Sequence, residues 1–189
     1  HMAIGLADLK LGRNEEAVRA FQRAIELDPN FAPTYAYLGI TRVLVGQSEE
    51  GARCFEQALQ RSPGVAVVHY LLADALLKQP DASVTRIEKS LKRAIELDAD
   101  YAPPRLALGK LYVREGRLPE AVAGFEEVIK IAPNLAEAYY QLGRALNRLE
   151  RTAEANTALN AYRRLSDMQK QEEQDEQRDV MRRLADVVF

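Results

Sequence analysis

The chain has 189 residues, of which 47% are hydrophobic and 29% charged, as in a folded globular protein rather than a disordered tail. Its 26 Lys and Arg against 28 Asp and Glu leave a formal net charge of -2, which favours neither nucleic acid nor an anionic membrane as a partner. No apolar run reaches the roughly 20 residues that span a bilayer, so the sequence predicts a soluble segment. It carries no targeting signal and indicates no compartment.

Helical patterns begin with the first residues and recur at a fixed period. His1 and Met2 resemble a cloning remnant, and a helical pattern follows them directly. We therefore interpret the chain as a piece of a longer protein. Four segments align without gaps: AFQRAIELDPN (20–30), CFEQALQRSPG (54–64), SLKRAIELDAD (90–100) and GFEEVIKIAPN (124–134). Their starting residues are 34, 36 and 34 positions apart, and a second helical pattern precedes each of them. The sequence therefore predicts one pair of helices per repeat.

Recurring glycines indicate how the two helices of a pair meet. Gly39, Gly109 and Gly143 fall in the middle of first helices, where glycine costs about 1 kcal/mol relative to alanine. We expect close contact between helices there, with small residues such as Ala121 opposite. A second set of glycines ends the first helices, where a left-handed cap needs no side chain. This set is Gly12, Gly46 and Gly116.

The second helices carry start signals and an apolar stripe. Asn14 and Ser48 are predicted N-caps, with acidic residues behind them that complement the helix dipole. One apolar column holds large side chains that only a neighbouring helix pair can bury. Its members are Phe21, Phe55, Leu91, Phe125 and Leu159.

These columns resemble the tetratricopeptide repeat family, whose signature is a 34-residue helix pair with small and aromatic residues at set intervals. The fullest match is residues 101–134, where the fitting residues are Leu108, Gly109, Tyr112, Gly116, Ala121, Phe125 and Pro133. The resemblance implies an all-α, right-handed superhelical solenoid of about five repeats over residues 1–166, with a long C-terminal helix over 167–189. The expected repeats are 1–30, 31–64, 65–100, 101–134 and 135–166. The third departs from the pattern, because Ala73 replaces glycine and residues 78–83 hold a turn two residues longer, which should bulge outward.

No constellation of residues indicates catalysis. Cys54 is the only cysteine, and we expect it half-exposed on a second helix without a histidine near it in sequence. His69 shares a column with Tyr35 and Tyr139, which indicates packing between helices. Every recurring glycine is explained by packing or capping, so there is no phosphate-binding loop. The sequence predicts no enzyme, no metal site and no cofactor.

In proteins that resemble this one, the first helices line a concave groove that holds peptides. One predicted groove column holds Ile40, Asp74, Lys110 and Arg144, and the next holds Leu44, Lys78, Arg114 and Arg148. The groove thus changes from apolar to basic along the chain, which predicts an acidic partner over repeats four and five. The predicted peptide-binding residues are Ile40, Tyr70, Asp74, Lys78, Lys110, Arg114, Tyr140, Arg144, Asn147 and Arg148. Two alternatives stay open, namely that the cations form a solvated rim and that Tyr70 is a core residue.

From Thr152 the helical pattern runs without glycine or proline to Phe189. Residues 169–179 are polar on every side and need solvent around them, after which an apolar stripe returns. We predict this stripe as a self-association surface, or alternatively as a cap on the last repeat. Its members are Val180, Leu184, Val187, Val188 and Phe189.

Two functions follow from these patterns. The first is an adaptor or scaffold that binds a protein or peptide in its concave groove, with no nucleic acid as partner. The second is a structural module that self-associates through its terminal helices, as a homodimer through the C-terminal helix.

Overall fold

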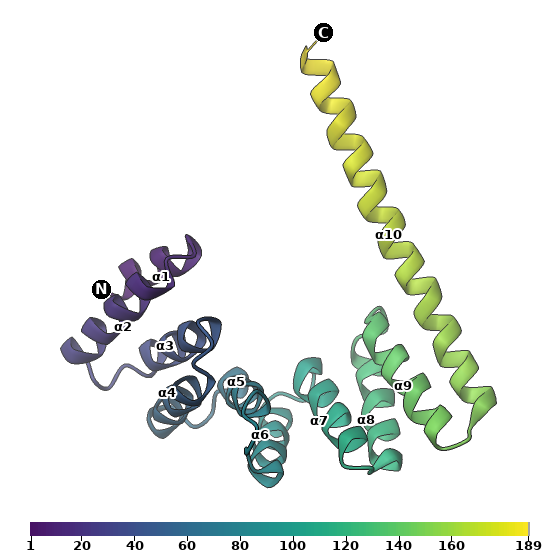
Figure 1. Ribbon diagram of the computed structural model, residues 1–189, viewed down its shortest axis with the longest axis horizontal. Helices are drawn as coiled ribbons and strands as arrows, with labels where there is room; N and C mark the ends of the chain where they lie inside the picture. The colour runs from purple at the N-terminus through teal and green to yellow at the C-terminus, as the bar shows by residue number, and fades with distance from the viewer. Residues whose placement is uncertain (189) are drawn as a thin grey trace. The chain divides into compact units, whose positions relative to one another are not determined.

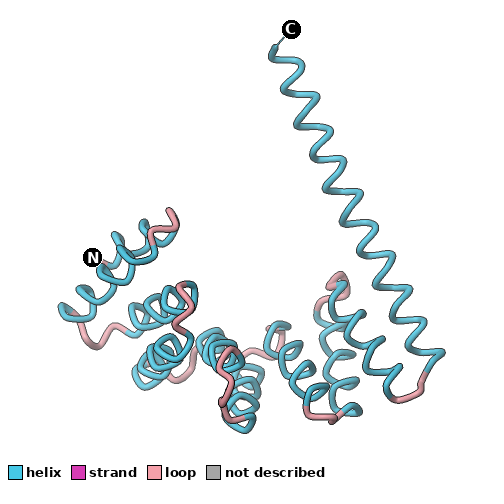
Figure 2. Tube along the Cα trace, viewed as in Figure 1, coloured by secondary structure: helices cyan, strands magenta, loops and turns pink. Residues whose placement is uncertain are grey.

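The computed structural model describes the backbone of residues 1–188 and the side chains of residues 1–181. Within the described backbone it contains ten α-helices and no strand (Figures 1 and 2). The helices are α1 (Met2–Lys10), α2 (Asn14–Leu27), α3 (Ala32–Leu44), α4 (Ser48–Arg61), α5 (Ala66–Leu77), α6 (Val84–Leu97), α7 (Ala102–Arg114), α8 (Leu118–Ile131), α9 (Ala136–Arg148) and α10 (Thr152–Val188). The predicted all-α architecture of helix pairs is confirmed.

The chain divides into two compact units, His1–Pro104 (unit 1) and Arg105–Phe189 (unit 2). In unit 1, α1 packs on α2, α3 on α4 and α5 on α6, and α2–α3 and α4–α5 contacts join successive pairs. In unit 2, α8 packs on α9, and α9 packs on α10. Within each unit these contacts join helices that are neighbours in sequence, which is the packing of a repeat solenoid.

The mid-helix glycines make the close contacts that the sequence predicts, and the nearest atoms are those of large side chains on the second helix. A Cβ atom at Gly39 would lie 2.7 Å from Cε1 of Phe55, and one at Gly109 would lie 2.5 Å from Cε1 of Phe125. Both phenylalanine rings are fully buried. The first helix therefore has room only for hydrogen at this column, and the nearest atoms that take the space belong to the phenylalanine ring. The residue one turn before the ring is Gly51 in α4 and Ala121 in α8.

The third pair solves the same packing problem with other residues. Ala73 occupies the glycine column and Leu91 the phenylalanine column, and both are 0% exposed. The third pair thus combines a larger residue on α5 with a smaller side chain on α6. In the turn between these helices, residues 78–83, Pro80 and Asp81 are exposed.

The ends of the first helices follow the prediction, whereas the starts of the second helices do not. Gly12, Gly46 and Gly116 have φ angles of 71°, 82° and 75°, so each adopts the left-handed conformation. Asn14 and Ser48 were predicted as N-caps, and this is wrong. They are the first helical residues, because Ala17 N–H bonds to the carbonyl of Arg13 and Gly51 N–H to that of Gln47.

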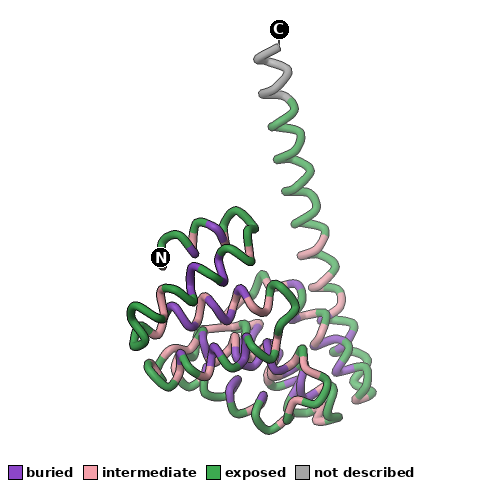
Figure 3. The backbone as a smooth tube through the Cα atoms, turned by 60° about the vertical axis from the view of Figure 1, so that its left-hand side comes forward, coloured by how far each residue is buried: buried purple, intermediate pink, exposed green. Residues whose placement is uncertain are grey.

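The last helix, α10, has a packed part and an exposed part. Ala155 and Ala158 are buried, and Tyr162 and Leu165 are half-buried, so the first turns complete the fifth helix pair. All described side chains of residues 167–181 are exposed (Figure 3). The polar stretch 169–179 is therefore exposed to solvent on every side, as its composition requires.

Candidate functional site

Unit 1 contains an apolar pocket of about 320 Å³ between α3 and α5. Its main lining residues are Pro33, Ala36, Tyr37 and Ile40 of α3 and Val67, Val68 and Leu71 of α5, with Ala58, Ser62 and Val65 beside them. The α3 residues are three or four positions apart, so they share one helix face. Val67 remains 45% exposed. This pocket, which we call the apolar pocket, can accept an aliphatic or aromatic side chain.

The remaining predicted residues of unit 1 do not add net charge to it. Lys78 Nζ lies 2.7 Å from Asp74 Oδ2, so the two form an ion pair four residues apart at the C-terminal end of α5. Tyr70 is half-buried and meets the ring of Tyr101 edge-on, with 5.6 Å between the ring centroids. The predicted groove residues of unit 1 are thus apolar, aromatic or paired as opposite charges.

Unit 2 brings the predicted cations of two helices together. Lys110 and Arg114 lie on α7, and Arg144 and Arg148 lie on α9; we call these four residues the basic patch. Nη1 of Arg148 donates a hydrogen bond to the carbonyl oxygen of Val113 at 2.9 Å. Lys110 also forms an ion pair with Glu137 across the two helices. Both contacts place α7 and α9 side by side at the patch.

Carboxylates neutralise half of the basic patch. Glu137 pairs with Lys110, and Glu115 Oε1 lies 3.3 Å from Nε of Arg114. Among the described side chains, no carboxylate pairs with Arg144 or Arg148. Glu137 and Glu115 lie outside the cation columns, so the spacing of those columns does not predict the pairing. Arg144 and Arg148, one turn apart on α9, therefore carry the unbalanced positive charge.

Two tyrosines stand next to the basic patch. Tyr140 is 37% exposed, and its ring centroid lies 5.2 Å from that of Tyr162 on α10. The guanidinium carbon of Arg144 lies 5.6 Å from the Tyr140 centroid, within the range of a cation–π interaction. Asn147 is exposed on the same helix. An aromatic surface thus flanks Arg144, where it can contact the aliphatic part of a bound segment.

Outside these surfaces, Cys54 and His69 are two residues with reactive side chains, and both have packing roles in the structure. Cys54 is buried rather than half-exposed as predicted, because α4 turns it toward the core. Desolvation by this burial raises the pKa of the Cys54 thiol, so its reactive thiolate form is disfavoured. Nε2 of His69 lies 3.0 Å from the Pro63 carbonyl oxygen. Tyr35 makes the matching contact in the preceding pair, donating its hydroxyl to Pro29 O at 2.9 Å.

Two kinds of feature are not found in the described part of the chain. Its side chains include no group of three or more His, Cys, Asp or Glu that could hold a metal ion. None of its helices combines the length and apolar character needed to cross a membrane.

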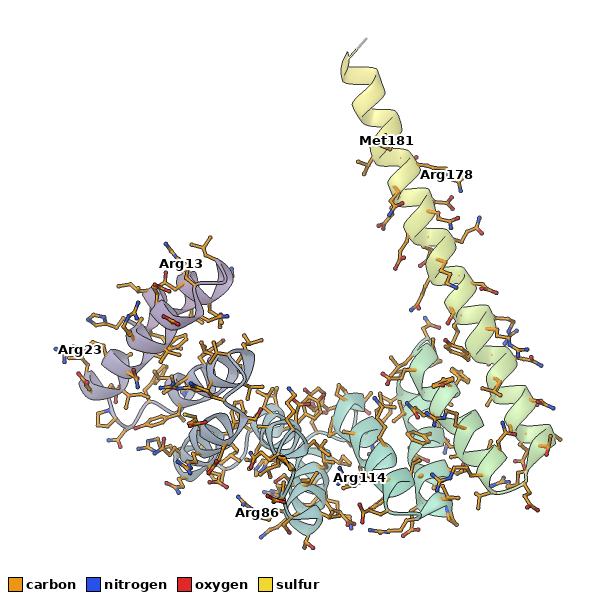
Figure 4. The ribbon with its side chains drawn as sticks, in the orientation of Figure 1. Arg13, Arg23, Arg86, Arg114, Arg178 and Met181 are labelled. Carbon is orange, nitrogen blue, oxygen red and sulfur yellow. The ribbon has the colours of Figure 1, made fainter. Side chains whose placement is uncertain are left out.

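The predicted self-association stripe lies mostly beyond the described side chains. Val180 is 55% exposed, and its neighbour Met181 is 68% exposed. In Figure 4, Arg178 and Met181 stand on the part of α10 that continues past α9. Leu184, Val187 and Val188 lie outside the residues whose side chains are described, as does Phe189.

Comparison with known proteins identifies the repeats. A family model for the TPR repeat matches residues 5–46 and 109–149, and two models for the tetratricopeptide repeat match residues 38–102 and 137–166. A curated relative, tetratricopeptide repeat domain-containing protein PYG7, chloroplastic, from Arabidopsis thaliana, is 38% identical over 78 residues, or 39% of this chain. The match spans 25% of that relative's length.

Solved structures share the fold over most of the chain. A crystal structure of MamA superposes with a TM-score of 0.84 at 24% identity, covering 90% of this chain and 99% of MamA. YrrB, described as a TPR protein with an unusual peptide-binding site, superposes with a TM-score of 0.74 at 25% identity. That match covers 87% of this chain and 84% of YrrB. These likenesses agree with the helix pairs described above.

Proposed function

The chain belongs to the tetratricopeptide repeat family, and we propose that it is an adaptor or scaffold that holds peptide segments on the faces of its first helices. The fold is that of a protein-protein interaction module, and such modules are typically not enzymes. The peptide-binding site named for YrrB supports the proposal. We assign the repeats to 1–30, 31–64, 65–100, 101–134 and 135–166, with 167–189 as a helical extension.

The apolar pocket is the observation that carries the proposal. Its volume of about 320 Å³ fits one or two side chains and lies at the lower end of the range for small-molecule sites. Burying one large apolar side chain of a ligand contributes about 1.5 to 3 kcal/mol to the free energy of binding. Successive first helices supply the walls, so a peptide crossing α3 and α5 would contact both. The pocket therefore acts as an anchor for an apolar side chain of the ligand.

A matched pair of valines tests this anchor. Peptides are first selected from a phage-displayed random library on the wild-type chain. Their dissociation constants are then measured on Val67→Glu and on Val45→Glu. Val67 lines the pocket, whereas Val45 is a similarly exposed valine at the end of α3 outside it. We expect Val67→Glu to weaken binding about tenfold or more, the equivalent of one lost apolar anchor, and Val45→Glu to leave it unchanged. Equal effects of the two variants would contradict the proposal.

We further propose that unit 2 accepts acidic segments of the partner at the basic patch. Arg144 and Arg148 support this, since their charge has no carboxylate partner among the described side chains. A guanidinium group offers up to five N–H donors and binds carboxylates in a bidentate manner. The tyrosines beside Arg144 provide additional contact area.

A second candidate function is self-association through the terminal helix. The observation that favours it is the exposure of Val180 and Met181 at the start of the apolar stripe. Analytical ultracentrifugation of the intact chain beside Leu184→Asp with Val188→Asp tests it. If both chains remain monomeric at tens of micromolar with equal helicity and melting, as judged on the scale of weak complexes, the stripe is not an interface.

A further inference from the structure

One face of the exposed part of α10 is acidic. Glu172, Asp175, Glu176 and Asp179 are spaced by three or four residues, so their side chains lie on one side of the helix. All four are exposed. Asp175 forms an ion pair with Arg178 of the same helix. Among the described side chains, the other three carboxylates have no basic partner. We call this set the acidic face.

The same unit contains cations of matching number and spacing. Arg144 and Arg148 are four residues apart on α9, as Glu172 and Glu176 are on α10. Four residues of α-helix rise about 6 Å, so the two pairs have the same repeat along their helices. Arg148 uses Nη1 to bond the Val113 carbonyl, and its guanidinium retains further N–H donors. The two surfaces are therefore complementary in both charge and spacing.

The two surfaces cannot meet within one chain. The turn 149–151 connects α9 to α10, so Arg148 lies beside the start of α10 at Thr152. Glu172 follows Thr152 by 20 residues, which places it about 30 Å farther along the helix axis. Since α10 continues unbroken to Val188, no turn brings its acidic face back. A partner for the acidic face must come from another molecule.

We propose that the acidic face of α10 docks on the basic patch of a second copy of this chain. The proposal rests on the function assigned above to the basic patch, a receptor for acidic segments, and names α10 as that segment. Both surfaces belong to unit 2, so two copies can exchange them reciprocally about a two-fold axis. Because the charges are exposed, the contact is weak and strongly dependent on salt.

Sedimentation velocity of the full chain at about 0.05 M and about 0.5 M salt, on either side of physiological screening, tests the proposal. We expect a dimer at low salt that dissociates at high salt. Glu172→Gln with Glu176→Gln should weaken it about fivefold or more, the effect of losing two charged contacts. The control is Gln174→Lys with Gln177→Lys, which changes net charge by the same two units on the opposite face. Equal effects of the two double variants would overturn the proposal.

A charge exchange makes the test specific to the two surfaces. Glu172→Arg with Glu176→Arg should abolish the low-salt dimer, and so should Arg144→Glu with Arg148→Glu. Mixing these two chains leaves one wild-type surface pair, so it should restore a heterodimer. If each chain alone is monomeric and the mixture also stays monomeric, the surfaces do not pair. If self-association persists at high salt and in both variants, the contact is apolar and this proposal is wrong.

A separate probe distinguishes failure of this inference from failure of the proposed function. A fluorescent oligoglutamate peptide is titrated into the wild-type chain and into Arg144→Glu with Arg148→Glu at low salt. Binding that the variant loses, combined with a wild-type chain that stays monomeric, would leave the basic patch as a receptor but reject α10 as its ligand. If neither the peptide nor a second copy binds, both assignments are wrong.

Discussion

In unit 1 the first helices present Ala36, Ile40 and Val67 around an apolar pocket, whereas in unit 2 the column of Ile40 is occupied by Lys110 and Arg144. Beneath these faces the two units are built alike. Gly39 packs on Phe55 in one and Gly109 on Phe125 in the other, at nearly the same distance. The buried columns are thus shared by the two units, and under the proposed function the exposed columns of the first helices set what each unit binds. We therefore expect that framework and binding chemistry can be changed separately.

The largest expected effect tests the shared framework. Phe55→Ala and Phe125→Ala should each lower the free energy of unfolding by about 3 to 5 kcal/mol, because each leaves a cavity where the ring filled the space above a glycine. Urea denaturation followed by circular dichroism measures both. Phe31→Ala is the control. Because Phe31 is 47% exposed, this substitution should lower the free energy of unfolding much less. A loss below about 1 kcal/mol at either buried position would show that the units are not built alike.

A double-mutant cycle tests the exception in the third pair. Leu91→Phe alone should destabilise the chain by about 1 to 3 kcal/mol, because Ala73 occupies the space that glycine leaves open elsewhere. Adding Ala73→Gly should recover most of this loss. The coupling energy should exceed about 0.5 kcal/mol, the usual error of additivity. Strictly additive effects would mean that the two columns do not compensate each other.

Salt dependence tests the difference between the faces. Arg114→Glu with Arg148→Glu should weaken binding of an acidic peptide about tenfold at low salt and much less at high salt, since exposed charges act through screened attraction. Arg163→Glu with Arg164→Glu is the matched control, an exposed pair on α10 outside the basic patch. Fluorescence anisotropy at several salt concentrations measures both. An acidic ligand that binds the first variant as tightly as wild type at low salt would reduce the patch to a solvated rim.

The smallest effect concerns a single turn. Glu150 has φ 60°, at the position where the corresponding turn of the preceding pair has Gly116. A left-handed conformation costs a residue with a side chain about 1 to 2 kcal/mol, and glycine avoids this cost. Part of this gain is offset because glycine has greater conformational freedom in the unfolded chain. Glu150→Gly should thus raise the free energy of unfolding by up to about 1 kcal/mol. Thermal melting measures it, and a lower melting temperature would contradict this explanation.

The sequence predicted the helix pairs and the glycine caps because both depend on local periods and local backbone conformation. It did not predict the N-caps correctly, since Arg13 and Gln47 can occupy that position without any side-chain hydrogen bond. Nor did it predict the burial of Cys54, which depends on how α4 is rotated toward its neighbours.

For the candidate site, the cation columns could be read from the spacing of the first helices. The ion pair of Lys110 with Glu137 could not, because it joins two helices whose relative rotation the spacing leaves open. The apolar pocket could not be predicted from the sequence for a related reason. Its walls are ordinary apolar residues such as Val67 and Leu71, and only their arrangement across α3 and α5 makes a concavity.

An NMR titration of the isotope-labelled chain with an oligoglutamate peptide at low salt most directly tests the claim that exposed first-helix columns set the binding chemistry of each unit. We expect chemical-shift changes at Lys110, Arg144 and Arg148, and none at Ala36, Ile40 and Val67. The changes should disappear at high salt, because the contacts are between exposed charges. Changes of similar size on both sets of residues, or changes confined to the second helices, would contradict the account.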